Sequence, residues 1–422
     1  MKLQSILLKE HGQKNKEKLE RLIKALGEKD EKRASWAFCL GAGVSMSCGL
    51  PSWGKLLAML SARMLCSVNT SVENNPEEQL IIELTNEIKK GIKTSDIFLK
   101  RLLASEDGSD VDVYQGIDYL ELAEYVYAGI KRRIGDYGVQ IGNNNENAAD
   151  LMLKELIGEC FEIEKGDGDQ PVPGYNGSTL QYIAQIMKTR KIYRAATYNY
   201  DNLLEIALRT ELEVKTEEKE CAAGSVQSVL PEEHREFTEE EGVWKVFHFH
   251  GRVPVRIESG AGEDAFRYEK PGGKVILSEE SYYDEEHYHY SPANVLQSYM
   301  MNNCNVIYVG FSGSDYTFRR IIKGMHGTES TKYIFFCVDD IVDGMYQKVR
   351  EDMKKQNQGA ELVKQEFLDK LDKEYVYWRL LINHIIIYKE LYWYEKGFEV
   401  VWTTIEELPE TLKSLSEPAS SV

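Results

Sequence analysis

The 422-residue sequence contains no C-x-x-C pair and no long apolar run. Its seven cysteines are scattered, which argues against both a zinc ribbon and a disulfide scaffold. No apolar segment approaches the roughly 18 residues that a membrane span needs. The first residues read as a charged helix and not as a signal peptide. We therefore expect a reduced, cytoplasmic protein that does not bind a membrane.

The chain also lacks the excess of basic residues that nucleic-acid binding requires. Its net charge is −18, whereas binding to phosphates needs a positively charged face. Because 42% of the residues are hydrophobic and 10% are aromatic, the chain can bury a sizeable core, which argues against disorder throughout. The length allows either one large domain with insertions or several ordinary domains.

Several apolar runs of strand length end in small or polar residues, and a helical pattern follows them. The runs lie within residues 36–40, 191–197, 243–250, 305–309, 332–338 and 396–402. This repeat predicts an α/β fold with a Rossmann-like, doubly wound parallel sheet.

Other segments carry helical or acidic patterns. The sequence predicts an N-terminal helix within residues 1–34, either packed on the domain or holding a partner, and then a main domain over residues 35–418. A helical insertion is predicted at about 55–190, and a helical excursion rich in aromatic residues at about 343–395. Those aromatics fit core packing or an oligomer interface. Residues 210–241 are acidic and read as a solvated surface segment.

The first candidate site follows residues 36–40 directly. Gly41, Ala42 and Gly43 come first, and Ser45 and a helical pattern come next. Glycines at such a turn let the backbone approach a pyrophosphate, to which the amides of the turn and helix start can donate. Small residues also form ordinary tight turns, so this motif alone leaves both interpretations open.

Two further candidate groups lie at the ends of later strands. Thr197, Asn199 and Asp201 stand where open α/β sheets bind ligands, although Asn199 or Asp201 could equally cap the next helix. Strand alternation places His248 and His250 on one face. Their spacing suits metal ligands, but no carboxylate or cysteine cluster completes a site, so His250 reads as a general base or a core histidine.

The last candidates follow two later strands. Gly310 and Ser312 end the run that begins at Asn305, and Asp315 is predicted to cap the next helix. Asp339 lies among the acidic residues that end the following strand.

Taken in order, these motifs resemble the sirtuin fold, and more narrowly the bacterial sirtuin-like NAD hydrolases of antiphage defence. The motifs are G-A-G-x-S followed by Gly49-Leu50-Pro51, then T-x-N-x-D, H-G and Gly-Phe-Ser, over roughly residues 36–340. The resemblance implies that NAD⁺ is the substrate, that Asn199 positions the attacking water, and that His250 is the base near the ribose hydroxyls. It implies NAD⁺ contacts at Gly41, Ala42, Gly43, Ser45, Pro51, Thr197, Asp201, Gly310, Ser312, Asp315 and Asp339.

The sequence departs from the protein-deacylating sirtuins at two places. Their G-I-P is followed by Asp-Phe-Arg, whereas Ser52-Trp53 follows Pro51 here. Their zinc module of two C-x-x-C pairs is missing, because no cysteine lies between Cys221 and Cys304. We therefore expect no zinc, and we expect an NAD⁺ glycohydrolase that releases nicotinamide and ADP-ribose and depletes NAD⁺ during infection.

The resemblance also implies an assembly. We expect a homo-oligomer that pairs with a HerA-type hexameric ATPase. Two alternatives remain open, namely a zinc-free sirtuin-type deacylase or ADP-ribosyltransferase, and a non-catalytic sensor of NAD or ADP-ribose.

Overall fold

A computed structural model describes residues 3–28, 35–66, 119–136, 145–163, 179–213, 225–230, 241–257, 271–278, 281–282, 291–313, 315–324, 330–339, 341 and 375–417 of the chain. Much of the predicted helical insertion and most of the predicted excursion lie outside these residues. Among the helices within the described ranges, none has both the length and the apolar character that crossing a bilayer requires.

Seven parallel strands form one sheet, which confirms the predicted fold class. Their order across the sheet is β4-β5-β3-β1-β7-β8-β9. The strands are β1 (Trp36–Leu40), β3 (Arg194–Thr197), β4 (Val226–Val229), β5 (Trp244–His248), β7 (Asn305–Val309), β8 (Lys332–Cys337) and β9 (Phe398–Thr403). A separate parallel pair joins β2 (Glu162–Ile163) to β6 (Arg256–Ile257).

Side chains of the central strands alternate between two apolar cores, one on each face of the sheet. In β1, Phe38 and Leu40 enter the first core, whereas Ala37 and Cys39 enter the second. Buried strands of a parallel sheet are apolar on both faces because helices cover both. This requirement explains why the strand sequences read as continuous apolar runs.

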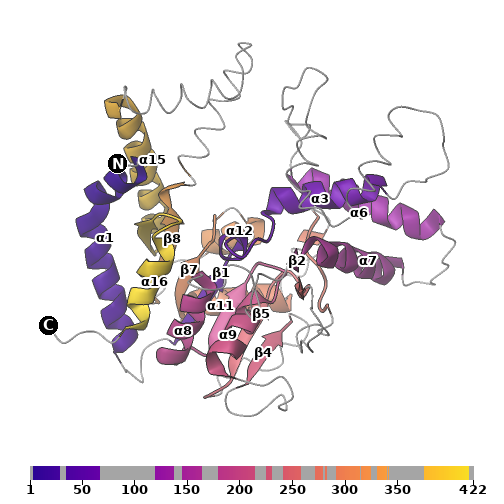
Figure 1. Ribbon diagram of the computed structural model, residues 1–422, viewed down its shortest axis with the longest axis horizontal. Coiled ribbons are helices and arrows are strands. Elements are labelled where there is room, and N and C mark those ends of the chain that lie inside the picture. Colours follow the sequence, from indigo (N-terminus) through magenta and orange to yellow (C-terminus); the bar gives the residue numbers. More distant parts are fainter. Residues whose placement is uncertain are drawn as a thin grey trace.

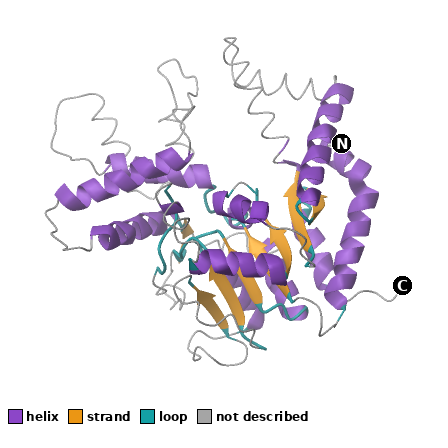
Figure 2. Ribbon diagram, turned by 180° about the vertical axis from the view of Figure 1, so that it is seen from behind, coloured by secondary structure: helices purple, strands orange, loops and turns teal. Residues whose placement is uncertain are grey.

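Helices cover both faces, so the sheet is doubly wound (Figures 1 and 2). The first core takes residues from α1 (Leu3–Gly27), α8 (Thr179–Thr189), α9 (Leu203–Leu212) and α16 (Leu408–Ser416). The second takes residues from α11 (Pro292–Asn303), α12 (Tyr316–Gly324) and α15 (Tyr375–Glu395). A short helix, α2 (Ala42–Met46), follows β1 directly.

Three described helices of the predicted insertion pack on one another. They are α3 (Trp53–Cys66), α6 (Tyr119–Asp136) and α7 (Asn145–Cys160). Figure 1 shows this group on the opposite side of the molecule from α1, α15 and α16. Helix α8 lies within the predicted boundaries of the insertion, but it packs with α9 and α16 on the sheet.

The described part of the acidic segment around residues 210–241 includes a strand of the sheet, so the interpretation of this segment as a purely solvated excursion is wrong. Strand β4 pairs in parallel with β5 and forms one edge of the sheet. Val226 is the one buried residue of this strand, and the other three are half-buried. An edge strand that is only partly covered does not need an apolar sequence.

The N-terminal helix packs on the domain, at the other edge of the sheet. On α1, the Asn15 side chain donates to the carbonyl of Trp402 (2.8 Å) and accepts from its amide (3.2 Å). The Lys18 ammonium donates to the carbonyl of Val400 (2.8 Å) and pairs with Glu390 (2.5 Å). These bonds occupy backbone groups of the edge strand β9 that another strand could otherwise pair with.

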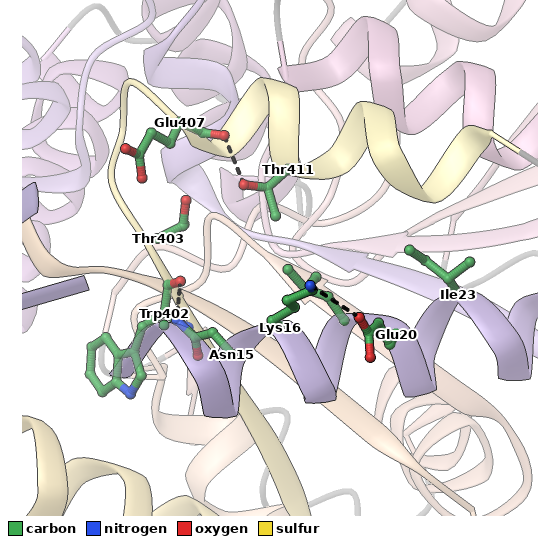
Figure 3. A pocket seen from close by; sticks show the side chains of 10 residues that line it. Asn15, Lys16, Glu20, Ile23, Trp402, Thr403, Glu407 and Thr411 are labelled. Carbon is green, nitrogen blue, oxygen red and sulfur yellow. Dashed lines mark hydrogen bonds and ion pairs between the residues drawn. The ribbon is translucent and has the colours of Figure 1, made fainter. Parts of the chain in front are cut away.

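A shallow pocket of about 330 Å³ lies between α1, α16 and the end of β9 (Figure 3). Its lining includes Asn15, Lys16, Glu20, Trp402 and Thr411. None of the residues predicted to contact NAD⁺ lines it.

Candidate active site

The predicted motifs converge at the carboxyl edge of the sheet because their strands are in register. Four residues from neighbouring strands are aligned, namely His248, Thr197, Leu40 and Val309. Each motif follows one of these residues directly, so Asn199 and His250 both lie two residues beyond a matched position. In the sheet, β3 lies on one side of the neighbouring pair β1 and β7, and β8 lies on the other side. The chain therefore continues from β1 and from β7 in opposite directions across the sheet. Such a topological switch point is where open α/β sheets bind their ligands.

The glycines of the first turn allow a close backbone contact with the end of β7. The Gly41 amide donates to Val309 O (3.1 Å), and the Gly43 amide donates to Gly310 O (2.9 Å). A Cβ atom at Gly41 would lie 2.5 Å from Gly310 O, and one at Gly43 would lie 2.9 Å from Gly310 Cα. Protein packing therefore accounts for these glycines, and both amides donate within the chain.

The turn presents an exposed part and a buried part. Ala42 and Gly43 are exposed, whereas Gly41 and Ser45 are buried. The Ser45 hydroxyl accepts a bond from Asn199 and also bonds the Asp201 carboxylate. A ligand at this turn would therefore meet the backbone of Ala42 and Gly43 first.

Asn199 joins the end of β3 to the turn after β1. Its side-chain nitrogen donates to Gly41 O (3.1 Å) and to Ser45 Oγ (2.9 Å), and its backbone amide donates to Thr197 Oγ1 (3.0 Å). These bonds use the amide hydrogens of the side chain and leave its Oδ1 oxygen for a ligand or water. Asn199 thus does not cap α9, because its side chain reaches across to the neighbouring strand.

Asp201 bonds groups on both sides of the same loop. Its Oδ1 accepts a bond from the amide of Leu203 (3.1 Å), at the start of α9. Burial raises the pKa of this carboxyl, and the bonds from Ser45 and Leu203 oppose that rise. Asp201 therefore stabilises the helix start, as the capping interpretation predicts.

His250 contacts the carboxylate of Asp315, which lies between β7 and α12. Its Nε2 lies 3.0 Å from Oδ2 of Asp315, to which the Tyr282 hydroxyl also donates (3.1 Å). The rings of Tyr198 and Tyr282 meet the imidazole edge to face, with centroids 5.3 and 5.4 Å away. All these groups come from different loops, so the contacts hold the imidazole from several sides.

Asp315 also caps α12, as predicted, because its Oδ1 accepts the amide of Phe318 (2.9 Å). Burial by itself would raise the pKa of this carboxyl, but the contact with His250 and the hydrogen bonds from the Phe318 amide and the Tyr282 hydroxyl together outweigh burial and lower it. Asp315 is therefore an ionised acceptor, with 12% of its side chain exposed.

His248 and His250 serve different carboxylates. Nε2 of His248 lies 2.6 Å from Oε1 of Glu205 on α9, and both side chains are fully buried. The Ser228 hydroxyl donates to the same oxygen (2.6 Å). Burial opposes ionisation of Glu205, but His248 lowers the pKa to about 2. Within the described residues, no group of three or more His, Cys, Asp or Glu side chains is arranged to hold a metal ion.

The remaining predicted residues lie around this edge. Pro51 is half-buried between α2 and α3, and Ser312 is exposed just beyond Gly310. Asp339 follows β8, two strands away from β1, and its Oδ2 accepts the amide of Ile405 (2.8 Å). Its carboxylate thus ties the end of β8 to the loop after β9.

Sequence reasoning missed two side chains that bond predicted or neighbouring site residues. Tyr282 donates to Asp315, and Glu205 holds His248. Glu205 is an acidic residue on an otherwise apolar helix face, which is a signal for a buried partner. Tyr282 stands in a segment rich in tyrosine and acidic residues, and nothing in its spacing distinguishes it.

Comparison with protein families gives a match over part of the chain. Residues 194–366 match the model of the SIR2-like domain. No curated protein matches the chain. The matched segment begins at β3 and contains Asn199, His250 and Asp315, whereas the glycine turn precedes it. Strand β1 nevertheless pairs with β3 and β7 of that segment. Residues 194–366 are therefore similar to SIR2-like domains, and this similarity implies the use of NAD⁺.

Proposed function

We propose that this chain is an NAD⁺ glycohydrolase that cleaves NAD⁺ to nicotinamide and ADP-ribose. The observation that carries the proposal is that Asn199 and His250 each lie two residues beyond the paired ends of neighbouring strands, with Asn199 bonded to the glycine turn. The nicotinamide of NAD⁺ is a cationic leaving group that departs as a neutral molecule, so positive charge develops on the ribose and the transition state resembles an oxocarbenium ion. Such a reaction needs a positioned nucleophile and electrostatic support more than a strong acid.

The two residues take different roles in this proposal. Asn199 directs Oδ1 toward the attacking water, since its nitrogen is held by Gly41 and Ser45. His250 acts as the base near the ribose hydroxyls and is held by Asp315. An oriented amide oxygen and a fixed imidazole are the kinds of group that place a water and move a proton.

The rest of the site would bind the two halves of NAD⁺. The exposed backbone of Ala42 and Gly43 approaches the pyrophosphate, and Pro51 and Thr197 line the nicotinamide side. Gly310, Ser312 and Asp339 contact the adenosine half. No zinc is part of this proposal.

The test is NAD⁺ breakdown by the purified protein, followed by chromatography. We expect nicotinamide and ADP-ribose in equal amounts from the wild type, and a loss of about 10²-fold or more in Asn199→Ala and His250→Ala. The matched controls are Asn302→Ala and His384→Ala, which change exposed residues on α11 and α15. These controls should keep wild-type activity.

The outcomes separate the alternatives. Turnover that requires an acylated peptide would indicate a deacylase, and NAD⁺ binding without turnover would indicate a sensor. A wild type that neither binds nor cleaves NAD⁺ would refute the NAD assignment.

The resemblance to sirtuin-like defence enzymes supports a wider role. We propose that the enzyme depletes cellular NAD⁺ during phage infection, as a homo-oligomer together with a HerA-type hexameric ATPase. An affinity purification from the native host should recover such an ATPase. A purification that retains this chain without any ATPase would contradict the partnership.

A further inference from the structure

Three side chains from three separate segments meet at the candidate base. Asp315 precedes α12, His250 follows β5, and Tyr282 belongs to the segment 281–282. The imidazole Nε2 and the tyrosine hydroxyl both reach Oδ2 of Asp315, at 3.0 and 3.1 Å. The other carboxylate oxygen, Oδ1, accepts the amide of Phe318 at 2.9 Å. The carboxylate is therefore held in position by contacts with three groups.

We propose that Asp315 and Tyr282 are positioning residues that set the tautomer of His250, with the proton on Nε2 and the lone pair on Nδ1. The proposal deepens the function assigned to His250 above and rests on it for its catalytic consequence. A carboxylate that faces Nε2 favours a proton there, because the alternative tautomer would place two lone pairs against each other. Nδ1 is then the nitrogen that accepts a proton from the substrate side.

The surroundings favour an ionised Asp315 and protonated tyrosines in this cluster. Asp315 stays ionised, because the hydrogen-bonding contacts of His250, the Phe318 amide and Tyr282 together lower its pKa despite burial. The two tyrosines that face the imidazole, Tyr198 and Tyr282, stay protonated at neutral pH, since burial raises the pKa of both well above the usual value. Protonated Tyr282 therefore acts as a hydrogen-bond donor toward Asp315. In the proposed tautomer, Oδ2 accepts from both Tyr282 and His250 while the carboxylate stays ionised.

The geometry also restricts rotation of the imidazole. Tyr198 and Tyr282 contact the ring edge to face, and the Tyr198 hydroxyl is itself held by Gln297 (2.7 Å). A ring that is packed between two anchored aromatics and bonded at Nε2 presents Nδ1 in one direction. This arrangement is the pre-organisation that a general base requires.

The decisive variant is Asp315→Asn. An asparagine keeps an oxygen for the amide of Phe318, so the cap of α12 remains. Its amide nitrogen then faces Nε2 as a donor, and we expect the proton of His250 to move to Nδ1. In a Ser-His-Asp triad, the corresponding change lowers kcat about 10⁴-fold through the wrong tautomer. We expect a kcat that is lower by about 10²- to 10⁴-fold here, with KM within about threefold of the wild-type value.

Tyr282→Phe tests the second positioning residue. The change removes one hydrogen bond to Asp315 but keeps the ring against His250. We expect a kcat that is lower by about 3- to 10-fold, the effect of one hydrogen bond. The control is Ser291→Ala, which removes the side-chain cap of α11 (3.1 Å to the amide of Asn294) without touching His250. Its kcat should stay within about twofold of the wild-type value.

The direct readout is ¹⁵N NMR of the histidine-labelled protein without NAD⁺, with the His250 signals assigned by comparison with His250→Gln. The proposal requires a protonated Nε2 in the wild type and a protonated Nδ1 in Asp315→Asn. A wild-type imidazole with its proton on Nδ1, or an unchanged tautomer in the variant, would overturn it whatever the activity. If the tautomers are as expected but the wild type does not cleave NAD⁺, the glycohydrolase function fails and the positioning of the proton stands.

Discussion

The buried pair of Glu205 and His248 gives a prediction about stability that can be worked out from the structure. Both side chains are fully buried, and their polar atoms lie 2.6 Å apart. Replacing Glu205 by leucine leaves the imidazole of His248 buried with neither nitrogen bonded within the described residues, among which Nδ1 already has no partner. Removing one member of a buried pair costs about 3 to 5 kcal/mol. We expect this loss in Glu205→Leu, and a similar loss in His248→Leu.

The double variant Glu205→Leu/His248→Leu should behave differently. It removes both polar groups, and apolar replacement of a buried pair is often close to neutral. Its free energy of unfolding should therefore be nearer to the wild-type value than that of either single variant. This expectation corresponds to a coupling of about 3 kcal/mol or more between the two sites.

The assays are thermal unfolding and urea unfolding of all four proteins. At about 2 cal/mol/K per residue, a chain of 422 residues loses about 1 °C of Tm per kcal/mol. The single variants should therefore unfold about 3 to 6 °C below the wild type. Glu20→Leu serves as the control, because the pair of Lys16 and Glu20 is exposed and 3.8 Å apart, and its loss should shift Tm by less than about 1 °C. Additive losses in the double variant would refute the reasoning.

Two further predictions concern the close packing at Gly310 and the loss of stability at low pH. Gly310→Ala should destabilise the protein clearly more than Gly49→Ala in thermal unfolding, because both residues have a positive φ (66° and 93°) but only at Gly310 would a Cβ lie 2.5 Å from the amide of Val44. Equal losses would contradict this steric reasoning. The pKa of Glu205 is lowered from 4.5 to about 2, so its stabilising contribution is complete above pH 4.5 and is lost as the pH falls toward 2. Acid titration of wild type against Glu205→Gln should show that extra loss in the wild type alone.

The strands could be predicted from the sequence because burial on both faces makes them apolar. Residues 36–40 and 305–309 became β1 and β7 with the predicted bounds. Strand β4 could not be found in this way, because an edge strand with one buried residue carries little hydrophobic signal. Its place beside β5, and not beyond the other edge, depends on pairing between distant segments, which no local pattern encodes.

The candidate site was predictable only in part, for a related reason. The ends of the strands that carry Asn199 and His250 could be located approximately, and the parallel register then brings these two residues together. The partners of these residues could not be located, because Asp315 reaches His250 from 65 positions away and Tyr282 lies in a segment without a pattern. A glycine motif likewise shows that something approaches the backbone closely, but not whether a ligand or another strand does so.

The hydrogen bonds of Asn199 link the ends of several strands. Its side chain donates to the turn after β1, while its backbone belongs to the loop after β3. The turn itself is held against Gly310 at the end of β7. The direction of the asparagine oxygen therefore depends on three strand ends, and the glycines act on the chemistry through packing as well as through any contact with NAD⁺. A change at Gly310 should consequently alter both the stability of the turn and the orientation of the Asn199 amide, although Gly310 need not touch the reacting atoms.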